Sequence, residues 1–226
     1  MVKENDKTEQ HNRLFEEWEQ TTNEYKGRFV RDGIIEEQLY KSALPKILFI
    51  LKEPNDPGQE ADDIREWWKD RKQSLNAFGK RLAELSYGLL QDFPPFENIS
   101  TNNNDATYID IIHRIALMNI KKSGGGGISK CDQMMDHAKM NINFLHREIK
   151  IIEPDIIITG TSWPCLRDEV FKNNNIEWKN SGYAIQIGRY NDAKVIDFYH
   201  PSSRNAAPAL YSLLQNIVHS DMFRRL

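Results

Sequence analysis

The feature that most constrains the fold is the stretch ILFILKEPNDPG at residues 47–58. Its first six residues are nearly all apolar, and the rest are dense in Pro, Asn, Asp and Gly. A short apolar run that ends in turn-forming residues is typical of a strand buried on both faces of a parallel sheet. Ligands of open α/β sheets bind outside the carboxyl ends of such strands. We therefore expect the carboxylates of Glu53 and Asp56 at a functional edge.

Composition narrows the class of protein. The 226 residues carry a net charge of −3, which argues against a strongly basic nucleic-acid binder but not against a local basic patch. No apolar run approaches the roughly 18 residues of a membrane helix, and the polar N-terminus does not resemble a signal peptide. Two cysteines indicate neither a disulfide framework nor a zinc site. We expect a cytoplasmic monomer without a cofactor or metal.

Further apolar runs and helical periodicities alternate along the chain. Strands are expected at residues 115–120, 156–159, 182–190 and 194–199. Helices are expected within residues 5–26, 78–89, 108–115, 134–152 and 210–218, and loop at 92–105. This alternation predicts one α/β domain over residues 1–226, a three-layer α/β/α sandwich with a central, mostly parallel four-stranded sheet. Residues 1–45 would be a helical extension packed on it.

Polar side chains collect after three of the predicted strands. They are Glu53, Asn55 and Asp56; Asn119, Lys121 and Lys122; and His200, Ser202 and Arg204. Parallel strands would gather all three sets at one edge of the sheet. A carboxylate there can stabilise an oxocarbenium-like sugar, a His can stabilise a departing base, and an Asn can read a base edge. The combination suits cleavage of an N-glycosidic bond.

The segments that carry these residues resemble motifs of the uracil-DNA glycosylase superfamily. LFILKEPNDPG is similar to the family's first motif, IALMNIKK to the second and FYHPSSRN to the third. EPDIIITG resembles the strand between the last two, so the resemblance spans residues 47 to about 218. It implies a DNA glycosylase that flips a pyrimidine nucleotide into a pocket and leaves an abasic site.

The resemblance also implies individual roles. Glu53 falls on the catalytic carboxylate, Asn119 on the base-reading amide and His200 on the catalytic imidazole. Arg204 falls on the wedge that fills the duplex gap. With Asn205 it forms an Arg-Asn pair, and the motif that contains this pair is most similar to that of the single-strand-selective monofunctional uracil glycosylases. Residues implied to bind substrate are Asn55, Asp56, Phe78 (the stacking aromatic), Lys121, Ser202, Arg204 and Asn205.

Three positions depart from the family's best-known branch. Lys52 replaces a Gln, Asn55 replaces the Tyr that walls off the pyrimidine C5 position, and Asp56 replaces a His. A short amide at Asn55 leaves room for a polar C5 substituent. We therefore hypothesise that the target is uracil or a hydroxymethylated or glycosylated pyrimidine of phage DNA, which would make the protein a defence rather than a repair enzyme. Two cysteines cannot supply the four that the iron–sulfur branch needs.

Other interpretations remain open. Glu53 and His200 could cap local backbone, and Asn119 could form a turn. Trp67 and Trp68 could be core, a helix-packing surface or a base-stacking platform. Lys121 and Lys122 could be solvated or bind phosphate, and the glycines at 124–127 could be a DNA-contacting flap or a linker. The rival functions are a catalytically inactive nucleic-acid-binding member of the same fold and a hydrolase of free nucleotides.

Overall fold

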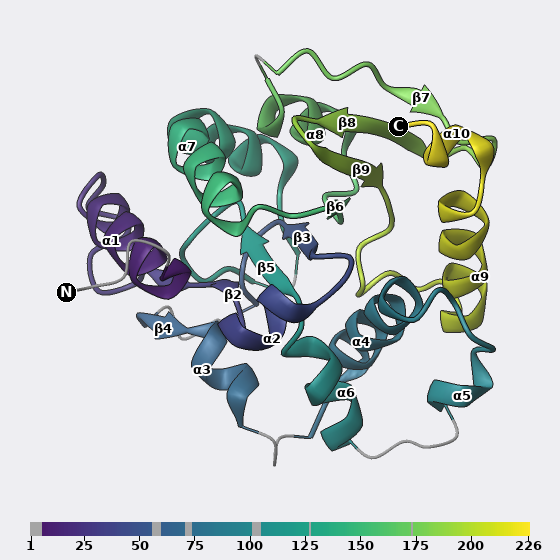
Figure 1. Ribbon diagram of the computed structural model, residues 1–226. Coiled ribbons are helices and arrows are strands. Elements are labelled where there is room, and N and C mark those ends of the chain that lie inside the picture. Colours follow the sequence, from purple (N-terminus) through teal and green to yellow (C-terminus); the bar gives the residue numbers. More distant parts are fainter. Residues whose placement is uncertain (1–5, 56–59, 71–73, 101–104, 127, 173) are drawn as a thin grey trace.

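The computed structural model describes residues 6–55, 60–70, 74–100, 105–126, 128–172 and 174–226 (Figure 1). Within these residues the chain is a mixed α/β protein whose helices surround one large sheet. No helix in this part of the chain is both long and apolar enough to span a membrane. The α/β class expected from the sequence is therefore confirmed.

The large sheet has seven strands in the described part of the chain, not the four expected. In spatial order they are β2 (Gly33–Ile34), β5 (Ala116–Asn119), β3 (Ile47–Leu51), β6 (Ile156–Thr159), β9 (Ala193–Asp197), β8 (Gln186–Tyr190) and β7 (Lys179–Asn180). The neighbours β5, β3, β6 and β9 pair in parallel, whereas β2, β8 and β7 pair antiparallel. The sheet is therefore mixed. Its edge strands β2 and β7 have two residues each, too few to show an alternating pattern, whereas β8 lies within the strand expected at residues 182–190.

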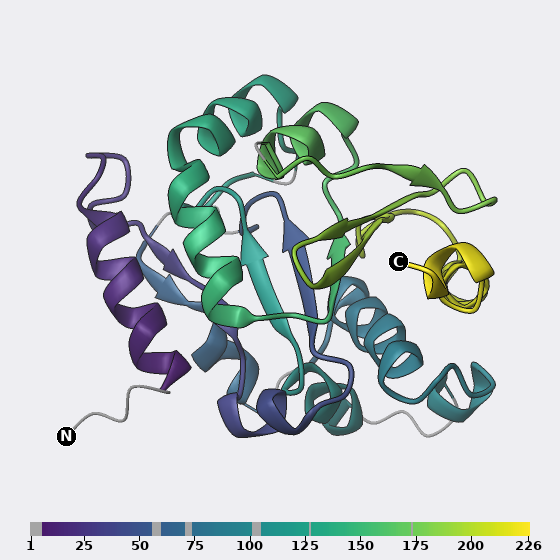
Figure 2. The ribbon, with the colours of Figure 1, turned by 45° about the horizontal axis from the view of Figure 1, so that its top comes forward.

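Helices cover both faces of this sheet and make three layers (Figure 2). Along β3, Phe49 and Leu51 pack into one core, and Leu48 and Ile50 into the other. The first core takes side chains from α3 (Ile64–Lys69), α4 (Ala77–Leu90), α6 (Asp105–Ile112) and α9 (Ala207–Val218). The second takes them from α1 (Lys7–Glu19), α7 (Cys131–Ile152) and α8 (Pro164–Val170). A strand buried on both faces, as β3 was predicted to be, requires this arrangement.

Short elements account for the other differences from the sequence prediction. The stretch at 92–105, expected to be loop, contains helix α5 (Glu97–Ser100). Helices α2 (Glu37–Ser42) and α10 (Asp221–Arg224) are likewise single turns or little more. Fewer than two turns of helix give too few apolar repeats for a periodicity to show.

The N-terminal segment supplies strands as well as the expected helix. Helix α1 buries Phe15 and Trp18, and the Trp18 indole donates a hydrogen bond of 2.8 Å to Oδ1 of Asn141 on α7. Strand β1 (Val30–Arg31) pairs with β4 (Asp62–Asp63), and β2 pairs with β5 at the edge of the large sheet. This segment therefore completes one edge of the sheet as well as covering a face.

A buried ion cluster lies beneath that edge. Lys122, considered from the sequence as a solvated charge, is completely buried and bonds Asp32 and Glu148, which are also completely buried. Its ammonium group also lies 5.0 Å from the centre of the Trp18 ring. Burial raises the pKa of Glu148 well above its ordinary value. One cation between two carboxylates is tolerated in the interior because each charge has an opposite neighbour.

Replacing Lys122 by Met should lower the free energy of unfolding by about 3 to 5 kcal/mol, because two carboxylates would lose their shared cation. Urea unfolding followed by circular dichroism measures this. Lys172→Met is the matched control, since Lys172 pairs with Glu169 while 57% exposed, and surface pairs contribute only about 0 to 1 kcal/mol. Equal losses in the two variants would contradict the assignment.

Candidate active site

The three residues expected to carry the chemistry lie along one edge of the sheet. Asn119 is the last residue of β5 and pairs in register with Leu51 at the end of β3, just before Glu53. His200 follows β9, next to Gly160 at the end of β6, where a β-carbon would lie 3.3 Å from the His200 Cα. Parallel pairing of β5, β3, β6 and β9 places all these strand ends on the same side. The edge predicted from the sequence is therefore present.

The Glu53 carboxylate is enclosed by the segment that follows β5. The ammonium group of Lys121 lies 3.3 Å from Oε2 of Glu53, whose side chain is 8% exposed. The amide of Gly125 donates to the carbonyl of Pro54 at 2.9 Å. A β-carbon on Gly125 would lie 2.8 Å from Oε1 of Glu53 and closer still to Oε2. A side chain at position 125 would therefore displace the carboxylate from its present place.

Asn119 is held by a residue that sequence reasoning missed. Oδ2 of the buried Asp32 accepts hydrogen bonds from the Asn119 backbone amide at 2.7 Å and from its Nδ2 at 3.1 Å. A carboxylate only accepts hydrogen bonds, so the Nδ2 end of the Asn119 amide must face Asp32. No hydrogen bond to Oδ1 of Asn119 forms within the described residues.

His200 is a neutral imidazole with a defined tautomer. Its Nδ1 accepts a hydrogen bond of 3.0 Å from the backbone amide of Ser202. Burial and the nearby positive charge of Lys52 lower the pKa of His200 to about 4. Since Nδ1 is an acceptor in a neutral ring, Nε2 carries the proton and can donate it in a hydrogen bond. The Phe78 ring stacks beside the imidazole with centroids 5.9 Å apart.

Lys52 and Trp163 join the site without having been predicted in it. The ammonium group of Lys52 lies 4.8 Å from the centre of the Trp163 ring, and burial lowers the pKa of Lys52. Lys52 could have been predicted to lie in the site, because it directly precedes Glu53 in the sequence. Trp163 comes from the loop after β6, and its place became evident only once the strands were arranged.

The remaining predicted residues are more exposed. Asn55, Ser202, Arg204 and Asn205 lie at the surface, and Nδ2 of Asn205 is 3.5 Å from the Ser203 hydroxyl. Asp56 lies outside the described residues.

The structure places one of the two adjacent tryptophans in the core. Trp68 is 4% exposed and belongs to the core, whereas Trp67 is 42% exposed. The core interpretation therefore holds for Trp68.

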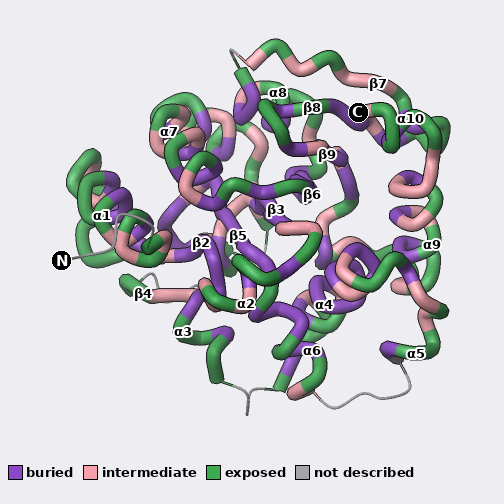
Figure 3. Tube along the Cα trace, in the orientation of Figure 1, coloured by how far each residue is buried: buried purple, intermediate pink, exposed green. Residues whose placement is uncertain are grey.

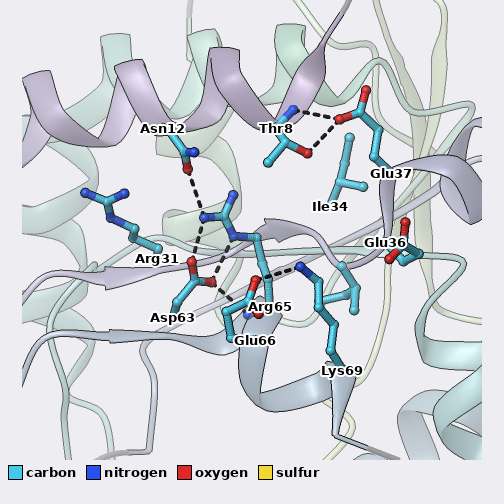
Figure 4. A pocket seen from close by; sticks show the side chains of 11 residues that line it. Thr8, Asn12, Arg31, Ile34, Glu36, Glu37, Asp63, Arg65, Glu66 and Lys69 are labelled. Atoms are coloured by element: carbon cyan, nitrogen blue, oxygen red, sulfur yellow. Dashed lines mark hydrogen bonds and ion pairs between the residues drawn. The ribbon is translucent and has the colours of Figure 1, made fainter.

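A cavity of about 240 Å³ lies between α1, α2 and α3, and its lining includes none of these residues (Figure 4). Several of its charged groups bind neighbouring residues. Arg65 donates to Asp63 at 2.6 Å and to Asn12 at 3.0 Å, and Glu37 accepts from the Thr8 hydroxyl at 2.6 Å. Figure 3 shows buried, intermediate and exposed residues side by side in this part of the chain. Because none of the predicted site residues lines this cavity, we place the candidate site at the sheet edge.

No protein-family model and no curated protein matches this sequence. Within the described residues no group of three or more His, Cys, Asp or Glu side chains is arranged to hold a metal ion. The interpretation of the site therefore depends on its own geometry and on the motifs quoted above.

We predict that the His200 ring titrates near pH 4 and that Lys52→Met raises this midpoint, because a nearby cation disfavours the imidazolium. Histidine side-chain NMR across pH 3 to 8 measures it. Lys194→Met is the control, since the Lys194 ammonium group bonds the carbonyl of Phe223 on another part of the surface. A wild-type midpoint at the ordinary value would contradict the proposed environment.

Proposed function

We propose that the protein is a monofunctional DNA glycosylase that hydrolyses the N-glycosidic bond of a flipped-out pyrimidine nucleotide. The observation that carries the proposal is the placement of Glu53, Asn119 and a neutral His200 at one edge of a parallel run of strands. The run β5-β3-β6-β9 would correspond to the central four-stranded sheet of a uracil-DNA glycosylase-like fold. The four sequence motifs, in order along these strands, support this.

The chemistry follows from the state of each side chain. As the bond between C1′ and the base nitrogen breaks, the sugar becomes cationic and the base departs as an anion. Glu53 stabilises the sugar and orients the water that attacks C1′. His200 donates its Nε2 proton in a hydrogen bond to a base carbonyl, which stabilises the anion without an imidazolium. Asn119 accepts from a base N–H through Oδ1, in the orientation that Asp32 dictates.

Exposed side chains around the edge suit DNA. Arg204 fills the gap left by the flipped nucleotide, and Ser202 and Asn205 contact the backbone beside it. Phe78 stacks on the base, next to His200. Lys121 is engaged by Glu53, so we assign it to holding the carboxylate. Asn55, at the surface, faces the C5 substituent and decides between uracil and a C5-modified phage base.

One observation favours the rival, a catalytically inactive nucleic-acid-binding member of the same fold. Glu53 is paired with Lys121 and covered by Gly125. An enclosed carboxylate reaches the sugar only after the segment carrying Gly125 moves. DNA binding without any abasic product would favour this alternative.

We predict that wild-type protein releases a free base from DNAs containing uracil or C5-modified pyrimidines, identified by mass spectrometry. His200→Asn and Glu53→Gln should each slow release by about 100-fold or more, in the range typical of a catalytic acid–base group, with unchanged circular dichroism. His219→Asn, which alters a histidine paired with Asp92, is the control. Full activity in both site variants would overturn the mechanism, and uracil released far faster than every C5-modified base would refute the phage-base hypothesis.

The two neighbouring glycines provide a matched test of the enclosure. Gly125→Ala should slow base release by about tenfold or more, since displacing a catalytic group by about 1 Å is costly. Gly126→Ala should remain close to wild type, because a β-carbon there meets nothing within 4 Å. Single-turnover release rates measure both. Equal rates would show that the position of the Glu53 carboxylate does not matter.

A further inference from the structure

The two cysteines of the chain lie side by side. Cys131 is the first residue of α7, and Cys165 is the second residue of α8. Their sulfur atoms are 3.4 Å apart although the residues are 34 positions apart in sequence. Both are free thiols. Helices α7 and α8 run next to each other on one face of the sheet (Figures 1 and 2), so this pairing is a product of the fold.

The geometry suits closure of a covalent bond. A disulfide needs a sulfur separation of about 2.0 Å, and the two sulfurs already lie 3.4 Å apart. Cys165 is exposed and Cys131 is partly exposed, so small reagents reach both sulfurs. Cys165 is the more exposed of the two thiols.

We propose that Cys131 and Cys165 are a reversible redox pair that closes to a disulfide when the protein meets a peroxide. The Cys165 thiolate attacks one peroxide oxygen, becomes a sulfenic acid and releases hydroxide, which is protonated to water. The Cys131 sulfur then attacks the sulfenic sulfur, forms the S–S bond and releases a second water. Two thiols and one hydrogen peroxide give one disulfide and two waters. A dithiol reductant reverses the reaction.

The order of attack follows from the unequal exposure of the two thiols. Their hydrogen bond raises the pKa of the Cys131 thiol. Cys165 is the more exposed of the two and meets the oxidant first. A pair that differs in this way provides one attacking and one resolving thiol.

The pair also joins two segments that flank the candidate site. Cys131 follows the segment whose Gly125 covers Glu53, and Cys165 lies shortly after Trp163, whose ring contacts Lys52. Closing the disulfide would tether these segments to each other. Oxidation would then hinder the movement that uncovers Glu53 and slow base release. This effect on base release, unlike the redox pair itself, rests on the proposed function.

The test uses the full chain treated with hydrogen peroxide and then with N-ethylmaleimide. Intact-mass analysis should show a monomer lighter by two hydrogens that takes up no maleimide, and dithiothreitol should restore two reactive thiols. Its Tm should exceed that of the reduced protein, because the bond closes a long loop of the unfolded chain. Cys131→Ser and Cys165→Ser should each abolish this monomeric product. Two alkylated thiols, separate sulfinic acids or a disulfide-linked dimer in the wild type would overturn the pair.

Base release is then compared between the oxidised and reduced forms. Slower release in the oxidised wild type, with no such difference in Cys165→Ser, supports the tether. Equal release in a fully oxidised sample contradicts it. Absence of base release in both forms counts against the glycosylase, whereas the mass analysis still decides the redox pair.

Discussion

The buried carboxylate of Asp32 connects the interior of the protein to its candidate site. One of its oxygens bonds the ammonium group of Lys122, and the other accepts both hydrogen bonds from Asn119. Directly after Asp32, Gly33 at φ 103° allows the chain to turn into the edge strand β2. Charge balance in the core and the orientation of a site amide therefore depend on the same side chain. The N-terminal segment is thus part of the site's support.

Two lysines at the sheet edge each influence a different site residue. Lys52 lies over Trp163 and favours a neutral His200, and Lys121 neutralises the Glu53 carboxylate. In the proposed reaction the neutral imidazole stabilises the departing base, whereas the carboxylate can stabilise the cationic sugar only once its pairing with Lys121 is loosened. The same pairing keeps Glu53 enclosed until the segment with Gly125 moves. Access to the carboxylate therefore links the proposed chemistry to the segments that the two cysteines join.

The sequence predicted what depends on local pattern. The strands at 47–52, 115–120 and 156–159 and the long helix ending at Ile152 follow from apolar runs and periodicity. Lys122 could not be placed, because two lysines beside four glycines look solvated and both its carboxylate partners are distant in sequence. Asp32 was missed for the same reason. The role of the glycine run could not be predicted either, because the close approach of Gly125 to the Glu53 carboxylate is evident only in the structure.

Asp32→Asn tests most directly whether the fold orients a base-reading amide. An amide at position 32 can bond either end of Asn119, while Lys122 keeps Glu148 as its partner. The single-turnover rate of base release should fall by about tenfold or more, as expected for a lost hydrogen bond to a charged group. Urea unfolding of the same variant should show a smaller loss of stability than in Lys122→Met. Base release at the wild-type rate in a folded Asp32→Asn protein would contradict the account.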